Sequence, residues 1–364
     1  MWAPLLRGAA LSACAPRPSN RVKSRSECTP DAQVACKPDA QVACSSPGRD
    51  LAMVLAAQLC EVQHVTVLNE VFIGSEARAR GLVRKHQLRS DYRAIFPGVY
   101  RPKAMELTLA QRTRAAWLWS GRRAVIAGAA AAGMYGAKWI DEDEPIELVW
   151  SNARPPSGIR TRRDRLGEGE VRRVRDRLGE GEVRSAWHLP VTTPVRTAFD
   201  VGRLTRGELG VARLDALGHA TGFDPEAVRA LARRHAGSPG IPRLRAALAL
   251  HDRGAESPRE TWLRLLLIRG GYPRPRTQIP VLDDYGRARY YLDMGWEDVM
   301  VAVAYDGEHH RDRAVFCNDI IRAEYIAERG WKRVRVVAGQ RPAGVLDRVA
   351  RAWAAGVRTD REIG

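Results

Sequence analysis

Short apolar runs and amphipathic stretches alternate most clearly over residues 251–364. Ser257 and Glu260 have the spacing of a capping box, so a helix is expected from Ser257 to about Arg269. The uninterrupted apolar run 299–305 is rich in β-branched residues, which indicates a buried central strand. Further strands are expected over 278–282, 288–294 and 334–337, with a turn at 283–286 and a helix over 315–329. The predicted order is therefore α-β-β-β-α-β.

The pattern of residues 53–103 predicts helices followed by a hairpin. The helices are expected over 53–65, over 74–81 with Ser75 as N-cap and Gly81 as stop, and over 82–92; the hairpin is expected over 94–100, turning at Pro97-Gly98. This is the order of a winged helix-turn-helix, in which the second helix of the pair enters the major groove. The predicted DNA-contacting residues on that helix are Arg84, Lys85, His86 and Arg89. A small helical subdomain with a purely structural role is the alternative.

Residues 104–205 combine predicted helices and strands, whereas residues 206–250 are helical throughout. Helices are expected over 107–120, 125–136, 208–219 and 225–235, and a strand over 145–150. A strand that begins at Val191 is expected to pass into a helix near Thr193, a suitable N-cap beside Pro194. The helices of 206–250 carry no evident chemistry and are interpreted as a connector.

Two short sequences occur twice. The sequence PDAQVAC is repeated within residues 1–52, which are rich in Pro, Ser, Arg and Ala and are expected to form a disordered tail. The sequence RDRLGEGEVR is repeated within an insert at 163–184. Two copies are too few for a repeat solenoid. The insert is expected to form an extended strand or a hairpin loop, and its mixed charges favour a solvated surface.

The charge balance points to polyanionic partners. Lys and Arg number 59 against 42 Asp and Glu, so the formal net charge is +17. Most of the surplus is arginine, which suits bidentate contacts with phosphate and guanine, although codon bias is an alternative explanation. No apolar run is long enough to cross a bilayer, so we expect no membrane association and a cytoplasmic location. None of the six cysteines belongs to a CxxC pair, which argues against a zinc site.

Three short motifs accompany the predicted winged helix. They are FPGVY at 96–100, AGMYG at 132–136 and TPVRT at 193–197 with Asp200. With these motifs, residues 55–205 resemble the AbiEi family of type IV antitoxins. The resemblance implies an operator-binding winged helix and a cognate toxin as partner. Arg196 and Asp200 are four residues apart and are predicted to form a structural ion pair on one helical face.

Carboxylates accompany the predicted C-terminal strands. Asp293 lies on the second strand, Asp306 follows the central strand, and Glu260 lies in the first turn of the preceding helix. Clustered carboxylates of this kind hold Mg²⁺ in nucleases. Together with Gln278, Tyr305-Asp306-Gly307, His310, Asp319, Arg322 and Gly330-Trp331, they make residues 255–340 resemble the very-short-patch-repair (Vsr-like) branch of the PD-(D/E)XK nucleases.

The resemblance implies a role for each matching residue. Asp293 would be the motif acid, and Asp293, Asp306 and Glu260 would together hold Mg²⁺, with Mn²⁺ as a substitute. His310 would assist proton transfer or contact phosphate, and Arg322 would position or bind DNA. The fold implied for the chain is α/β (α+β), with a winged helix, a mixed α/β middle region and a restriction-endonuclease-like C-terminal domain over 251–364.

One departure from the family pattern divides the functional hypotheses. Relatives end the central strand with Glu-Tyr-Asp-Gly, whereas this chain has Ala304-Tyr305-Asp306-Gly307. The chain is therefore expected to be either a Mg²⁺-dependent endodeoxyribonuclease with a weakened site or a non-catalytic repressor or antitoxin that only binds DNA. In the second case Glu260 is only a helix cap and Asp306 only a turn residue. A third hypothesis is a protein-interaction scaffold whose basic charge is incidental. The sequence indicates no particular DNA site or oligomeric state.

Overall fold

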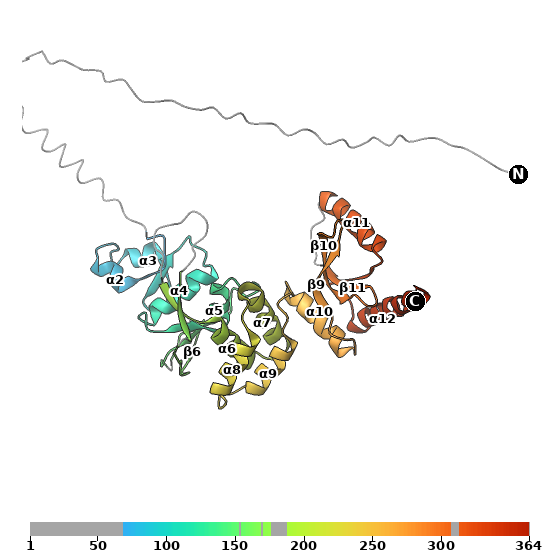
Figure 1. The fold of residues 1–364 in the computed structure, drawn as a ribbon. Coiled ribbons are helices and arrows are strands. Elements are labelled where there is room, and N and C mark those ends of the chain that lie inside the picture. Colours follow the sequence, from blue (N-terminus) through green and yellow to red (C-terminus); the bar gives the residue numbers. More distant parts are fainter. Residues whose placement is uncertain (1–67, 153, 169, 176–187, 307–312, 364) are drawn as a thin grey trace, which may run out of the picture. The chain divides into compact units, whose positions relative to one another are not determined.

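Three β-sheets with helices packed against them form the described part of the chain (Figure 1). The computed structural model describes residues 68–152, 154–168, 170–175, 188–306 and 313–363. The predicted tail 1–52 and the predicted helix 53–65 lie outside these residues. The described residues belong to one compact unit, Val65–Gly364. Helices combined with several separate sheets agree with the expected α+β class, and the finer domain boundaries stay a prediction.

The first sheet contains the predicted hairpin. It consists of β1 (Phe72–Ile73), β3 (Val99–Pro102) and β2 (Tyr92–Phe96) in this order, and helix α2 (Gly74–Ala79) follows β1 in the chain. β2 and β3 are antiparallel and turn at Pro97-Gly98, as predicted. α2 ends before Gly81, whose φ of 71° confirms it as the stop. Its N-cap is Ile73 rather than Ser75, and no side chain caps it.

The prediction of a helix over 82–92 is wrong. Only α3 (Gln87–Ser90) is helical there. Tyr92 begins β2 instead, because its side chain is almost fully buried and meets the ring of Phe72 edge-on, with 4.9 Å between ring centroids. The side-chain oxygen of Gln87 accepts a hydrogen bond from the Arg84 backbone N–H at 2.7 Å and holds the preceding turn. Aromatic packing thus overrides a local helical pattern.

The second sheet has five strands in the order β6-β5-β4-β8-β7. They are β4 (Val125–Ala127), β5 (Ile146–Val149), β6 (Ile159–Arg162), β7 (Val171–Arg175) and β8 (His188–Thr192). Helices α4 (Leu109–Trp119) and α5 (Gly128–Met134) share a core with this sheet that contains Ala116, Ala131 and Leu148. Thr108 starts α4 through a complete capping box with Gln111, which confirms the helix expected over 107–120.

Strand β4 corrects another prediction. Residues 125–136 were expected to be one helix, but Val125 to Ala127 pair with β5, and the helix begins only at Gly128. Gly128 has a φ of 61°, a left-handed conformation that glycine adopts without steric cost and that turns the strand directly into the helix. The strand expected over 145–150 is confirmed as β5.

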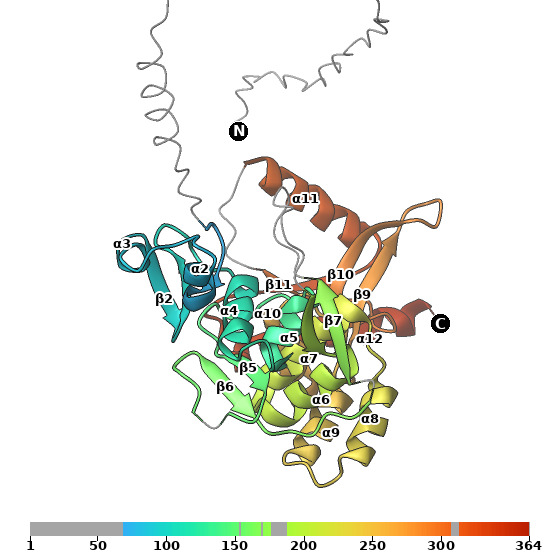
Figure 2. The same ribbon diagram turned by 90° about the vertical axis from the view of Figure 1, so that its left-hand side faces the viewer.

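Four helices follow the second sheet and pack on one another (Figure 2). They are α6 (Pro194–Leu204), α7 (Gly207–Thr221), α8 (Pro225–Arg234) and α9 (Ile241–Leu250). Their shared core includes Phe199, Leu214 and Leu244, each fully buried. The Thr193 hydroxyl accepts a hydrogen bond from the Arg196 backbone N–H, so the predicted passage from strand to helix is confirmed.

The first copy of the duplicated sequence supplies buried charges. Arg196 and Asp200 form the predicted ion pair at 3.0 Å, with both side chains buried. Asp164 and Glu170, from the first copy, also pair with Arg196, and Glu170 is only 5% exposed. The expectation of a solvated surface segment is therefore wrong for Glu170, which is buried against the Arg196 guanidinium, whereas the Asp164 side chain keeps 28% of its surface exposed. Most of the second copy lies outside the described residues.

The third sheet belongs to the C-terminal residues and has the order β12-β11-β10-β9. Its elements in chain order are α10 (Pro258–Arg269), β9 (Arg276–Leu282), β10 (Ala288–Trp296), β11 (Val301–Asp306), α11 (Arg313–Glu328), β12 (Lys332–Val337) and α12 (Pro342–Ile363). β9, β10 and β11 are antiparallel neighbours, whereas β11 and β12 are parallel. The predicted α-β-β-β-α-β order is thus confirmed, and α12 is an additional helix that the pattern did not predict.

Helices cover both faces of this sheet (Figure 1). Val301 and Val303 of β11 share a core with residues of α10 and α12, whereas Ala302 shares a core with Ile326 of α11. α10 and α12 therefore lie on one face and α11 on the other. Within the described residues, no helix combines the length and the apolar composition that a bilayer crossing requires.

Candidate functional site

Glu260 holds the start of α10 and is partly buried there. Its Oε2 accepts a hydrogen bond from the Glu256 backbone N–H at 2.9 Å, and its Oε1 accepts one from the Ser257 hydroxyl at 2.9 Å. The Ser257 hydroxyl in turn accepts a hydrogen bond from the Glu260 N–H, so the predicted cap is confirmed. Burial raises the pKa of the Glu260 carboxyl, and the charges of Asp293 and Glu256 raise it further, against the effect of these hydrogen bonds.

Asp293 on β10 is the partner acid of Glu260. Burial raises the pKa of the Asp293 carboxyl, and the charge of Glu256 adds to the increase. Arg322, Arg333 and a hydrogen bond from the Tyr305 backbone N–H act in the opposite direction. The charge of Asp293 contributes to the pKa shift of Glu260, so these two predicted site residues lie close enough to interact electrostatically.

Asp306, the third predicted acid, is paired with Arg335 on the neighbouring strand β12. The Nε of Arg335 donates a hydrogen bond to its Oδ2 at 2.6 Å, and the same carboxylate forms an ion pair with the Arg335 Nη2. Ala304 is buried and pairs in register with Arg335 across the parallel strands. The register of β10 and β11 ends at Met294 and Val303, so Asp293 and Ala304 are the next residues in line. The position that is Glu in relatives is therefore adjacent to the acid pair.

Three arginines lie near Asp293 and Asp306. Arg322 on α11 donates to the Tyr291 carbonyl at 2.6 Å and lies close enough to Asp293 to affect its pKa. Burial lowers the pKa of the Arg333 guanidinium, and the like charges of Arg322 and Arg335 lower it further, although Asp293 and Asp306 partly compensate. Burial is the largest cause of this lowered pKa, and the two neighbouring arginines add to it.

The described residues do not make up a complete magnesium site. Mg²⁺ favours six oxygen ligands, several of them water, with carboxylates as the main protein ligands. Glu260 and Asp293 supply two carboxylates, but Glu260 is bound to its own helix start and Asp306 to Arg335. Among the residues that the structure describes, no three of His, Cys, Asp or Glu gather closely enough to hold a metal ion.

Five other predicted site residues, His310 and the four basic residues before the hairpin, are not shown near the acid pair. His310 falls in the stretch 307–312, which is outside the described residues. The four basic residues predicted to contact DNA are all exposed. They do not share a helix, because Arg89 is on α3 whereas the other three lie in the turn before it. The four residues are Arg84, Lys85, His86 and Arg89.

No family model matches the chain. Two uncharacterized proteins of Mycobacterium tuberculosis, MT2308 and Rv2248, are each 28% identical to it over 265 residues. The match covers 71% of this chain and 90% of each relative. The similarity therefore extends over most of both chains, and the names of the two relatives state no activity.

The sequence assigned no role to three residues near these acids. Glu256, which belongs to the matching segment 256–260, raises the pKa of both Glu260 and Asp293. Arg333 brings positive charge to Asp293, and Arg335 brings it to Asp306. Arg333 and Arg335 reach the acids only through the parallel pairing of β12 with β11, and no local pattern predicts that pairing.

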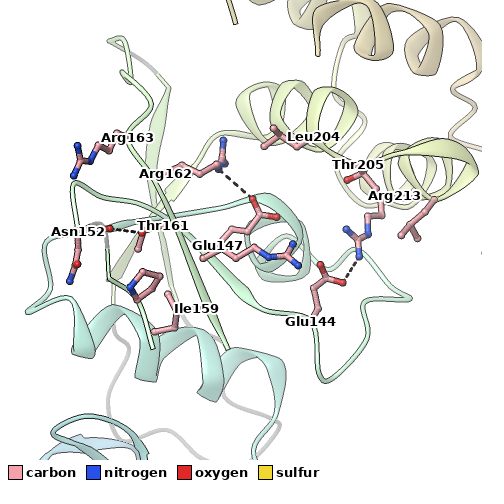
Figure 3. Close-up of a pocket in the computed structure, with 13 residues that line it drawn as sticks. Glu144, Glu147, Asn152, Ile159, Thr161, Arg162, Arg163, Leu204, Thr205 and Arg213 are labelled. Carbon is pink, nitrogen blue, oxygen red and sulfur yellow. Dashed lines mark hydrogen bonds and ion pairs between the residues drawn. The ribbon is translucent and has the colours of Figure 1, made fainter. Parts of the chain in front are cut away.

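A cavity lies in the middle region, and Figure 3 shows two oppositely charged pairs that face each other in it, Arg162 with Glu147 and Arg213 with Glu144. Its volume is about 830 Å³. Arg162 faces Glu147 at 3.4 Å, and Arg213 pairs with Glu144 at 2.5 Å. Burial raises the pKa of the Glu147 carboxyl, while the charge of Arg162 lowers it. Because these charges pair with one another, they are explained by a structural role. The pair Glu260 and Asp293 therefore remains the stronger candidate for a functional site.

Proposed function

We propose that this chain is a DNA-binding protein of a toxin–antitoxin or defence type, with a PD-(D/E)XK nuclease-like C-terminal domain that binds phosphate without cleaving it. The observation that carries the proposal is a cluster of arginines at the acids of the sheet: Arg322 and Arg333 near Asp293, and Arg335 paired with Asp306. Arginines next to carboxylates on such a sheet are suited to a scissile-phosphate position, and the missing acid at Ala304 favours binding over hydrolysis.

The electrostatics of Arg333 support an anionic ligand. Its guanidinium is partly buried and lies near two other arginines, Arg322 and Arg335, whose like charges disfavour its own. A phosphate group would relieve this repulsion through charge-assisted hydrogen bonds. Phosphate contacts position a protein on DNA without reading its sequence. The exposed Arg84, Lys85, His86 and Arg89 beside the hairpin are the proposed contacts of a winged helix.

The phosphate contact is tested by measuring affinity for a labelled DNA duplex. Arg333→Gln should weaken binding about tenfold, the effect of losing one charge-assisted contact. The matched control is Arg276→Gln, which removes the same charge from an exposed arginine of the same domain that pairs with Glu297. Equal affinities for the two variants would contradict the proposed contact.

The winged-helix contact is tested in the same assay. Reversing the charges of Arg84 and Lys85 to Glu should weaken duplex binding strongly. The control reverses Arg233 and Arg234 to Glu, an adjacent exposed pair on the helical connector, and therefore changes the net charge by the same amount. Unchanged affinity after reversal at Arg84 and Lys85 would remove this segment from the proposed interface.

Hydrolysis is the alternative function, and the Glu260 and Asp293 pair favours it. We expect the parent protein not to nick supercoiled plasmid with Mg²⁺ or Mn²⁺, and Ala304→Glu to gain nicking, with its melting temperature measured to verify folding. Nicking by the parent that disappears in Asp293→Ala would contradict binding without cleavage. A cognate toxin is a further part of the proposal and rests on the resemblance of residues 55–205. A cytoplasmic location is also proposed and rests on the sequence, in which no apolar run is long enough to cross a bilayer.

A further inference from the structure

A cleft of about 800 Å³ opens beside Glu260, one member of the acid pair. Lys138 and Trp139 line it from the loop after α5, and Arg259, Glu260 and Tyr305 line it from the C-terminal sheet and its first helix. Its volume is in the range of cavities that hold small organic ligands. The cleft therefore provides a space next to Glu260 that is large enough for a nucleotide.

Trp139 is the unusual residue of this cleft. Its side chain is 59% exposed, although tryptophan is normally among the more buried residues. Its backbone has a φ of 64°, a conformation that bulky side chains rarely adopt and that tends to occur at functional positions. Its indole N–H donates to the Glu256 carbonyl at 3.0 Å. The ring is thus fixed in orientation next to the acids while much of its surface stays in solvent.

Positive charge and a second aromatic ring complete the cleft. Lys138 and Arg259 are exposed, and neither forms an ion pair with a carboxylate among the described residues. The Arg259 guanidinium lies 5.9 Å from the centre of the Tyr305 ring, which itself meets Trp262 edge-on. Exposed aromatic rings interleaved with cations are the means by which proteins hold unpaired nucleotides, through stacking and phosphate contacts.

We propose that this cleft binds an unpaired nucleotide of a DNA strand, with the base stacked on Trp139 and the flanking phosphates at Lys138 and Arg259. The inference rests on the proposed DNA-binding function and adds a preference for single-stranded or distorted DNA. Within a duplex both faces of each base are covered by stacking, so Trp139 can contact a base only when that base is unpaired.

The test compares affinities of the full-length protein for three labelled probes of one sequence: a single strand, its duplex, and a single strand with abasic residues. Trp139→Ala should weaken single-strand binding about tenfold, the loss of one stacked base, and change duplex binding less than about twofold. Trp139→Phe should restore most of the affinity, because it keeps a ring. The control Tyr285→Ala removes an 83% exposed aromatic side chain from the hairpin between β9 and β10.

Each alternative outcome overturns a different claim. If the abasic strand binds as tightly as the normal strand, or if Trp139→Ala and Tyr285→Ala have equal effects, the stacking site is refuted while duplex binding stands. If an acidic peptide displaces the single strand as readily as unlabelled DNA does, the cleft recognises charge and not a base. If the parent binds none of the probes at physiological salt, the DNA-binding function itself fails.

Discussion

Asp293 and Glu260 are held in an environment that disfavours their ionised forms. Burial is the largest cause of both raised pKa values, and neighbouring carboxylates add to it. A carboxyl whose folded-state pKa is raised stabilises the fold at low pH, and this contribution is lost as the pH rises through the raised value. At neutral pH the acid pair therefore costs stability, which is typical of residues kept for function rather than for folding.

Asp293→Asn should accordingly make the protein more stable at about pH 7, and the gain should be much smaller at about pH 3, below the ordinary pKa of aspartate, where the parent carboxyl with its raised pKa is mostly protonated. Asparagine can still accept the hydrogen bond from Tyr305. Urea denaturation at the two pH values measures the effect. Asp298→Asn, at an exposed position two residues beyond β10, serves as control and should change little at either pH. A variant less stable than the parent at neutral pH would contradict the account.

Asp215 is a buried acid of the opposite kind, because its charge is compensated. The Arg264 Nη2 lies 2.7 Å and the Thr261 hydroxyl 2.8 Å from its Oδ2, and the His251 Nδ1 lies 3.1 Å from its Oδ1. Asp215 is on α7 and Arg264 on α10, so the pair joins the helical connector to the C-terminal residues. Both side chains are essentially inaccessible to solvent.

Asp215→Ala should lower the free energy of unfolding by about 3–5 kcal/mol, because it leaves the Arg264 guanidinium buried without its counter-charge. The matched control is Glu226→Ala, which removes a carboxylate that is 71% exposed from its pair with Arg229 and should cost less than about 1 kcal/mol. Chemical denaturation of both variants checks the prediction. A similar loss in the two would show that burial does not determine the strength of the Asp215 pair.

At the scale of elements, local signals predicted most starts and ends correctly. Thr193 and Ser257 cap α6 and α10, and the apolar run 299–305 contains the central strand β11. The failures have a common cause in long-range packing. Tyr92 joins β2 because it packs on Phe72, and residues 125–127 join a sheet whose other strands lie more than ten residues away in sequence.

The start of α9 depends on a glycine for a similar long-range reason. Gly240 has a φ of 88°, and a Cβ at this position would overlap the backbone carbonyl oxygen of Arg203. Gly240→Ala should therefore cost about 2 kcal/mol more than Gly222→Ala, a change at the end of α7 where φ is also positive but the space is open. Melting curves of the two variants check the prediction. Equal losses of stability would mean that the positive φ alone sets the cost and that the contact with the Arg203 carbonyl does not contribute.

At the scale of the whole molecule, the sequence predicted the acids of the candidate site but not their surroundings. Glu260 and Asp293 were found from strand order and resemblance, whereas Arg333, Arg335 and Trp139 reach the site through strand pairing or through a loop of the middle region. Contacts of this kind depend on the folded topology and leave no periodic signal in the chain. The net charge of +17 was visible from composition, but composition does not locate it.

The central claim is that the chain binds DNA through its phosphates, and the salt dependence of duplex affinity tests it most directly. Each neutralised phosphate releases counterions, so the logarithm of the association constant should fall linearly with the logarithm of the KCl concentration. We predict a loss of at least about a hundredfold between about 50 and 200 mM KCl, with a shallower slope for Arg333→Gln. An affinity that stays constant over this range would contradict the account.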